Sequence, residues 1–189
     1  MDNQTIAKHC TTFLSKEFRV AEFRNDDGSK HIDIMRCAET ERDFTCATVG
    51  LWDVDLGLQT GDDKELRVEL LMAGDDREKT KDAFENIVAT AAFSIMDHPE
   101  LCGFGIVIRD VVTEYVRDTE LAHVILLSPM LWESYAPLEE EGRVVTWLQL
   151  IPITERERAY LEEHSLEELE QLLDDHDTDV ADLHRPSCL

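Results

Sequence analysis

Segments in which apolar and polar residues alternate recur along this chain, and they constrain its fold more than any other feature. In residues 66–72, Leu66, Val68 and Leu70 fall on one face, whereas Arg67 and Glu69 fall on the other. A period of two is that of a β-strand with one face toward solvent. Similar patterns predict strands over residues 31–38, 44–51, 104–116 (bent or broken near Asp110), 123–128 and 143–153. Residues 123–128 are apolar on both faces, which predicts a central position in the sheet.

Helical spacing of apolar residues occurs between these strands. Residues 3–18 place Ile6, Cys10 and Leu14 on one stripe, and residues 77–96 have a broader stripe that ends before Pro99. After the last strand, Thr154 precedes Glu157 and Ser165 precedes Glu168 at the spacing of a capping box. Two short helices are therefore expected there.

The charge balance bears on possible partners. The chain has 189 residues, with 42 acidic and 18 basic side chains, and a formal net charge of −24. Binding to phosphates requires clustered Lys and Arg, so this composition argues against nucleic acid and against an anionic membrane surface. An acidic surface favours fast association with a basic protein, although solubility alone also explains the excess of acids.

Targeting signals and disulfides are not expected from this sequence. The first ten residues have no apolar core or cleavage site of a secretory signal, and no apolar run is long enough to span a membrane. The five cysteines are odd in number and widely spaced, which favours reduced thiols in a cytoplasmic protein.

The search for catalytic or metal-binding patterns gives no site. No Cys-x-x-Cys, His-Glu-x-x-His or calcium-loop pattern is present, so no metal and no cofactor are expected. Ser128 lacks the glycines of a nucleophile elbow, and Gly103–Gly105 leads into a predicted strand instead of a helix N-terminus. His123 opens an apolar strand, where a hydrogen-bonded structural role is expected. We therefore expect a protein that is not an enzyme.

The loop of residues 53–64 is the preferred candidate for a partner-binding site. Trp52 precedes it, and Asp53, Asp55, Asp62 and Asp63 give it a concentrated negative charge. Loops held by a rigid sheet often carry binding residues, and tryptophan is enriched among interface anchors. If Trp52 is exposed it is the expected anchor, whereas a buried Trp52 would belong to the core.

A second acidic face is predicted on the C-terminal helices. These acids lie opposite a leucine stripe, so a solvated helix face explains them without a partner. They are Glu162, Glu163, Glu167, Glu168 and Glu170.

The domain organisation is expected to be simple. No repeat or low-complexity linker divides the chain, so residues 1–176 are predicted to form one domain. Residues 177–189 contain few apolar residues and are predicted to be a loose acidic tail.

Several segments together resemble the bacterial suppressor of fused (SUFU) domain family. The resemblance extends from about Ile32 to Leu173, and its last segment is the most specific. The segments are Thr48-Val49-Gly50-Leu51, Arg67-Val68-Glu69-Leu70, His123-Val124-Ile125-Leu126-Leu127-Ser128-Pro129, and Trp147-Leu148-Gln149-Leu150-Ile151-Pro152-Ile153-Thr154 followed by Glu157.

The resemblance implies both a fold and a type of function. It implies an α+β domain with a mixed, mainly antiparallel central sheet and helices packed on it. It also implies an immunity protein that neutralises a cognate bacterial toxin by direct contact, and it supplies no catalytic residues. Two alternatives remain open: a small regulatory enzyme or ligand-binding protein with a cleft beside the acidic loop, and an adaptor or chaperone for a secreted effector.

Overall fold

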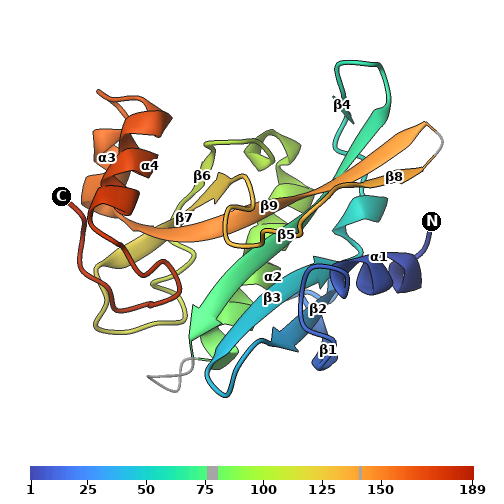
Figure 1. Cartoon of the computed structure of the whole chain (residues 1–189), viewed down its shortest axis with the longest axis horizontal. Coiled ribbons are helices and arrows are strands. Elements are labelled where there is room, and N and C mark those ends of the chain that lie inside the picture. The colour runs from blue at the N-terminus through green and yellow to red at the C-terminus, as the bar shows by residue number, and fades with distance from the viewer. Residues whose placement is uncertain (76–80, 141) are drawn as a thin grey trace.

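In this computed structural model the described residues form one sheet of nine strands, which includes the predicted segments of alternating polarity (Figure 1). The structure describes residues 1–75, 81–140 and 142–189. The strands are β1 (Phe18–Arg24), β2 (His31–Ala38), β3 (Asp43–Val49), β4 (Leu58–Gln59), β5 (Glu65–Asp75), β6 (Val107–Ile108), β7 (Leu121–Leu127), β8 (Leu138–Glu140) and β9 (Arg143–Thr154).

The sheet is mixed. Its strand order is β1-β2-β3-β5-β9-β7-β6, with β4 paired to β5 and β8 paired to β9 beside that path. Only β5 and β9 are parallel among the described pairs, and their register runs from Glu65 opposite Arg143 to Leu71 opposite Gln149. The predicted α+β class with a mainly antiparallel sheet is therefore confirmed. β7 is buried as expected, but it lies second from the β6 edge, and β5 and β9 are the more central strands.

Helices cover both faces of this sheet. The α-helices are α1 (Asn3–Cys10), α2 (Lys81–Asp97), α3 (Glu155–Tyr160) and α4 (Leu166–Asp175), and two short 3-10 helices are η1 (Leu51–Asp53) and η2 (Pro99–Leu101). Figure 1 shows α2 behind the sheet, with α1 and the α3–α4 pair at opposite ends of the molecule.

Three clusters of buried side chains match this arrangement. The α2 face includes Phe84 and Ile87, and it packs on the side of the sheet that carries Leu70. On the opposite face, α1 covers a cluster around Trp147, and α4 covers a separate cluster around Ile151. The sheet face opposite α2, called the front face below, is thus covered by α1 at one end and by α4 at the other. The segment that follows β7 lies between them.

Both predicted capping boxes are present. Thr154 accepts a hydrogen bond from the backbone of Glu157, whose carboxylate accepts one from the Thr154 backbone in return. Ser165 and Glu168 form the same reciprocal pair at the start of α4. These bonds satisfy N–H groups that a helix start otherwise leaves unpaired, so the prediction of two short helices is confirmed.

The first predicted helix is shorter than expected. α1 ends at Cys10, where the Thr11 and Thr12 hydroxyl groups donate to the carbonyl oxygens of Lys8 and His9. Such side-chain hydrogen bonds compete with continuation of a helix. The chain then forms edge strand β1 from Phe18, which the sequence analysis did not predict.

Two other predicted elements differ from the structure. The strand expected over residues 104–116 is reduced to β6, because Asp110 adopts a left-handed backbone conformation with φ of 61° and the chain turns away. The helix expected over residues 77–96 is observed as α2, and residues 77–80 lie outside the described part.

The prediction of a loose C-terminal tail was wrong. Leu183, Arg185 and Cys188 are all buried, and the Arg185 guanidinium donates to the Glu157 carboxylate at 2.8 Å. The overall composition of this segment is polar, but Leu183 packs in the core cluster on the α2 side, Cys188 packs in the α4 cluster, and Arg185 pairs with Glu157 of α3. The prediction failed because composition does not reveal such partners.

We expect the docked C-terminal segment to be protected from cleavage in limited proteolysis. Folded segments resist cleavage because their backbone must open before it can enter a protease. Brief treatment with proteinase K, which has no strict sequence preference, should leave residues 177–189 attached to a single large fragment, as mass spectrometry would show. Two stable halves separated by a cut near Pro137 would contradict the prediction of one domain.

Candidate protein-binding surface

The predicted anchor Trp52 is a core residue. It lies in η1 with only 6% of its surface exposed, and it packs with the cluster beneath α1. Its indole Nε1 donates to Asn3 Oδ1 at 2.8 Å. Because its apolar surface and its polar atom both have partners within the chain, Trp52 is not available as an exposed anchor.

The four predicted loop acids are exposed, two at each of two turns. Asp53 and Asp55 follow Trp52, whereas Asp62 and Asp63 form the turn between β4 and β5. Two of them have cationic neighbours, since Asp55 lies 3.7 Å from Arg67 and Asp62 lies 3.2 Å from Lys64. The Thr60 hydroxyl and Lys64 lower the pKa of Asp62. The negative charge of this loop is therefore partly compensated within the chain.

A buried carboxylate holds the start of this loop. Glu69 is fully buried on β5, and its carboxylate accepts from the backbone N–H of Gly50 at 2.8 Å and from those of Leu51 and Trp52 at 3.3 Å each. The Thr48 hydroxyl also donates to it. Burial raises the pKa of Glu69 to about 7, against the opposing effect of these hydrogen bonds. Glu69 was assigned to the solvent side in the sequence analysis, because its alternation with Leu70 did not reveal that α1 covers this face.

The sequence analysis left open a ligand-binding protein or small enzyme with a cleft beside the acidic loop. A groove does lie beside this loop. It has a volume of about 310 Å³, and its lining includes His31, Asp33 and Asp53. Among the described residues, none of these three side chains forms a hydrogen bond with another, whereas a nucleophile and its base are normally in such contact.

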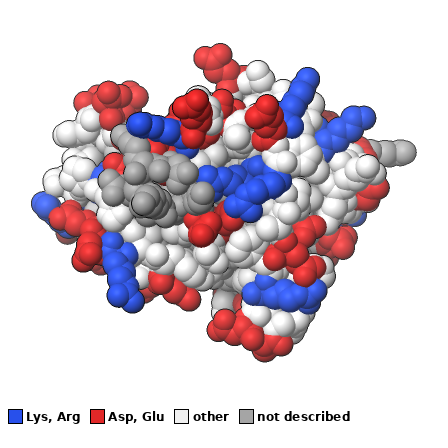
Figure 2. Space-filling model, turned by 90° about the horizontal axis from the view of Figure 1, so that it is seen from below, with Lys and Arg blue, Asp and Glu red and all other residues white. Residues whose placement is uncertain are grey.

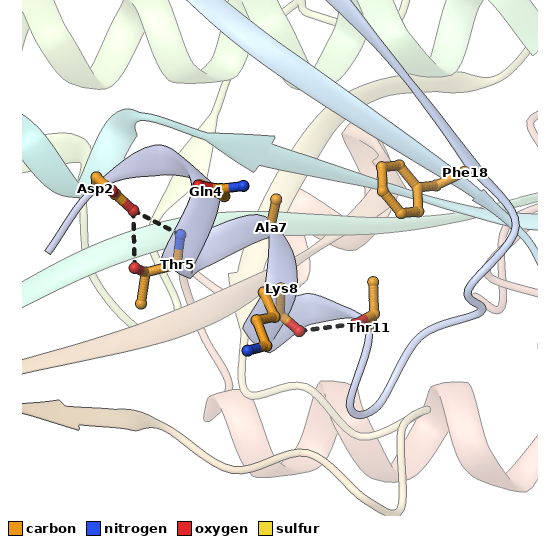
Figure 3. Close-up of a pocket in the computed structure, with 7 residues that line it drawn as sticks. All are labelled: Asp2, Gln4, Thr5, Ala7, Lys8, Thr11 and Phe18. Atoms are coloured by element: carbon orange, nitrogen blue, oxygen red, sulfur yellow. Dashed lines mark hydrogen bonds between the residues drawn. The ribbon is translucent and has the colours of Figure 1, made fainter.

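A second groove lies between α1 and the start of β1 (Figure 3). It measures about 580 Å³, and its polar side chains largely satisfy the helix itself. Asp2 accepts from the backbone N–H and the hydroxyl of Thr5, and the Thr11 hydroxyl donates to the Lys8 carbonyl oxygen. These groups serve as helix caps and do not converge on a ligand.

His123 has the structural role that the sequence suggested. Its ring is 4% exposed, and Nδ1 accepts from the Asp110 backbone N–H at 2.9 Å. Nε2 is then the protonated nitrogen and donates to Glu155 at 2.7 Å. Nδ1 thus joins β7 to the turn after β6 and Nε2 joins β7 to α3, so His123 is not placed as a base or metal ligand.

Metal sites and membrane spans were also sought. Within the described ranges, no three His, Cys, Asp or Glu side chains are grouped to hold a metal ion. Nor does any helix in the described part of the chain combine the length and apolarity needed to cross a membrane. The five cysteines are buried free thiols.

Charge of both signs occurs on the underside of the molecule. Figure 2 shows Lys and Arg side chains interspersed with Asp and Glu on this face. This face therefore does not present a continuous negative surface.

The sequence analysis missed a groove on the front face, between the segment after β7 and α4. Its volume is about 150 Å³. Met130 and Leu131 border it, and they are 57% and 52% exposed. The signal for it was the pair of apolar residues directly after Pro129, at the end of a buried strand.

Comparison with known proteins identifies the family. The family model described as Suppressor of fused protein (SUFU) matches residues 28–186, most of the chain. This protein belongs to the SUFU family. The family assignment made from the strand motifs is thus confirmed.

A curated relative of this SUFU protein covers almost the whole chain. Immunity protein YqcF of Bacillus subtilis is 28% identical over 189 residues, which cover 98% of this chain and 96% of the relative. Its name assigns an immunity-type role to that relative, which matches this chain over nearly its whole length.

Solved structures confirm the SUFU fold. A SUFU homologue from Neisseria gonorrhoeae superposes with a TM-score of 0.73 at 19% identity, covering 99% of this chain and 96% of the other. A chain of the Sufu-Fu complex crystal structure has a TM-score of 0.63 at 10% identity, with coverage of 98% of this chain and 90% of the other. At these identities the likeness concerns the fold alone.

Proposed function

We propose that this protein is an immunity-type protein that neutralises a cognate bacterial toxin by direct contact, without catalysis. The observation that carries this proposal is the match, over 98% of this chain, to a relative named as an immunity protein. The second solved relative is a complex with another protein, which is consistent with protein binding as the activity of this fold. A cytoplasmic location follows from the proposal if the toxin acts there.

The charge supports a basic partner. With a net charge of −24, the chain would attract a basic toxin over several ångströms and accelerate encounter. Contact over the toxin's active site would then block its substrate. An adaptor or chaperone for a secreted effector would also bind a protein, but it would not protect a cell from that protein's activity.

Co-expression tests this function. The toxic protein encoded beside this gene should inhibit growth alone, and growth should be restored when this chain is present. The two purified proteins should form a stoichiometric complex that abolishes the toxin's activity. Complex formation without protection would favour the adaptor role, and the absence of any complex would refute the proposal.

We further propose that the acidic loop steers this association. Neutralising its four acids should lower the association rate about tenfold at low salt and leave the dissociation rate nearly unchanged. Stopped-flow or surface-based kinetics at low and high salt would measure this. The variant replaces Asp53, Asp55, Asp62 and Asp63 with Asn.

A matched variant places the same charge change on the C-terminal helices. If it slows association while the loop variant does not, the loop is the wrong face. Association of the unmodified protein that is indifferent to salt would remove charge from the mechanism. The matched variant replaces Glu162, Glu163, Glu167 and Glu168 with Gln.

A further inference from the structure

The base of the groove next to Met130 consists of buried side chains of the central sheet. Gln149 and Ile151 of β9 are each 1% exposed and form that base. The Gln149 side-chain oxygen accepts a hydrogen bond from the Met130 backbone N–H at 3.1 Å. This bond holds the segment after β7 at one edge of the groove, while α4 forms the other.

Two adjacent apolar side chains remain exposed at this edge. More than half of the surface of both Met130 and Leu131 is accessible, although Trp132 next to them is partly buried. On the other side, Leu173 and Val180 continue the apolar lining. Adjacent exposed apolar residues that extend an apolar groove are typical of a protein-binding surface.

The rim of the groove is acidic and has no internal counter-charge. Glu170, Asp174 and Asp177 line it, and the described residues of its lining include no Lys or Arg. Within the described residues none of the three carboxylates forms an ion pair, in contrast to Asp55 and Asp62 of the acidic loop. Burial, together with the charge of Glu167, raises the pKa of Glu170.

These like charges oppose one another. Glu170 and Asp174 are one turn apart on α4, where carboxylates at this spacing destabilise a helix. A cation placed between them would relieve that repulsion. None of the described lysines and arginines lines the groove to supply such a cation.

We propose that this groove is the docking site for a segment of the partner protein that combines aliphatic side chains with lysine or arginine. The aliphatic side chains would pack on Met130 and Leu131, and the cations would lie against the acidic rim. This inference rests on the proposed function, which supplies a protein partner. A second copy of the chain is a poorer occupant, since it would bring another net charge of −24 to an acidic rim.

Methyl NMR with labelled methionine tests the docking site directly. Among the five methionines, Met130 is exposed, whereas Met35 and Met72 are fully buried and serve as internal controls. A synthetic peptide of leucine and lysine should shift the Met130 methyl signal but leave those of Met35 and Met72 in place. A peptide of leucine and glutamate should leave all three in place.

Variants separate the groove from general attraction between a basic peptide and an acidic protein. Replacing both Met130 and Leu131 with serine, or Glu170 and Asp174 with their amides, should weaken peptide binding at least tenfold. Neither change is expected to disturb folding, because these side chains are exposed or at the surface.

The matched controls change the same chemistry elsewhere on the surface. A Phe18→Ser and Val20→Ser variant removes two other exposed apolar side chains, and an Asp26→Asn and Asp27→Asn variant removes two other acids. Both should bind the peptide as the unmodified protein does. An unmoved Met130 signal, or equal losses in the groove and control variants, would overturn the inference.

The toxin identified by co-expression separates this inference from the proposed function. Loss of toxin capture in the groove variants, but not in the matched controls, supports both. A toxin complex that the groove variants leave unchanged refutes the docking site and retains the function. Self-association in sedimentation that requires Met130 would instead assign the groove to a second copy, contrary to the proposal.

Discussion

Replacing Arg185 with methionine is expected to lower the free energy of unfolding by about 3–5 kcal/mol, because the change leaves a buried carboxylate without its cation. Glu157 is fully buried and Arg185 is 4% exposed. The two Nη atoms of Arg185 contact the two carboxylate oxygens at 2.8 and 3.0 Å, and Nη2 also donates to the Pro152 carbonyl oxygen at 2.7 Å. The Cys188 backbone N–H donates to the same carboxylate at 2.9 Å.

A double variant shows whether the uncompensated charge causes this loss. Glu157→Gln keeps an oxygen for the capping box and removes the charge, so combining it with Arg185→Met should recover most of the stability. Urea unfolding followed by circular dichroism measures both variants. If the single variant is within about 1 kcal/mol of the parent, the C-terminal segment is not docked as described.

The same pair predicts sensitivity to acid. Although burial acts to raise it, the pKa of Glu157 is lowered to about 2 because the Arg185 charge and the hydrogen bonds outweigh burial. The pKa of an unfolded glutamate is higher, so this stabilisation is complete above about pH 4.5 and is lost as the pH falls toward 2.

The second large effect is a loss of stability with rising pH that depends on Glu69. Its pKa is about 7 in the folded protein and near 4.5 when unfolded, so the folded state binds the extra proton between these values. The Glu69 contribution is therefore fully present below pH 4.5 and is lost as the pH rises to 7. The difference amounts to about 3 kcal/mol, at about 1.4 kcal/mol for each pH unit.

Glu69→Gln should abolish this slope, since glutamine resembles the neutral acid at every pH. Urea unfolding of the parent and the variant at intervals from pH 4.5 to 7.5 gives the slope, and other titrating groups cancel in the difference. Glu41→Gln, at an exposed turn, should retain the parent slope. Equal slopes in the parent and the Glu69 variant would mean that the buried carboxylate stays ionised throughout.

The predictable parts of the fold were those encoded locally. The strand around Leu70 follows from its period of two, and α3 and α4 follow from the capping residues Thr154 and Ser165, which act within one turn of chain. The parallel pairing of β5 with β9 is different. It joins segments far apart in sequence, and the pattern of either segment does not specify its neighbour.

The parts that failed depend on contacts between distant segments. Trp52 is followed by an acidic loop in the sequence, but Asn3 of α1 provides its hydrogen-bond partner. Arg185 lies in a polar stretch, and its partner Glu157 was recognised only as a capping residue. The binding groove likewise combines Met130 with residues of α4, so the sequence shows its two edges separately.

The central parallel pair also sets the order in which the sheet is completed. β5 cannot meet β9 until the whole connection through α2, β6 and β7 has been closed, and such long-range pairing slows folding. On the ribosome, the apolar β5 would emerge with β3 as its only long strand partner and with one edge unpaired. The interval before β9 is synthesised is therefore when this chain is most exposed to aggregation or to chaperone capture.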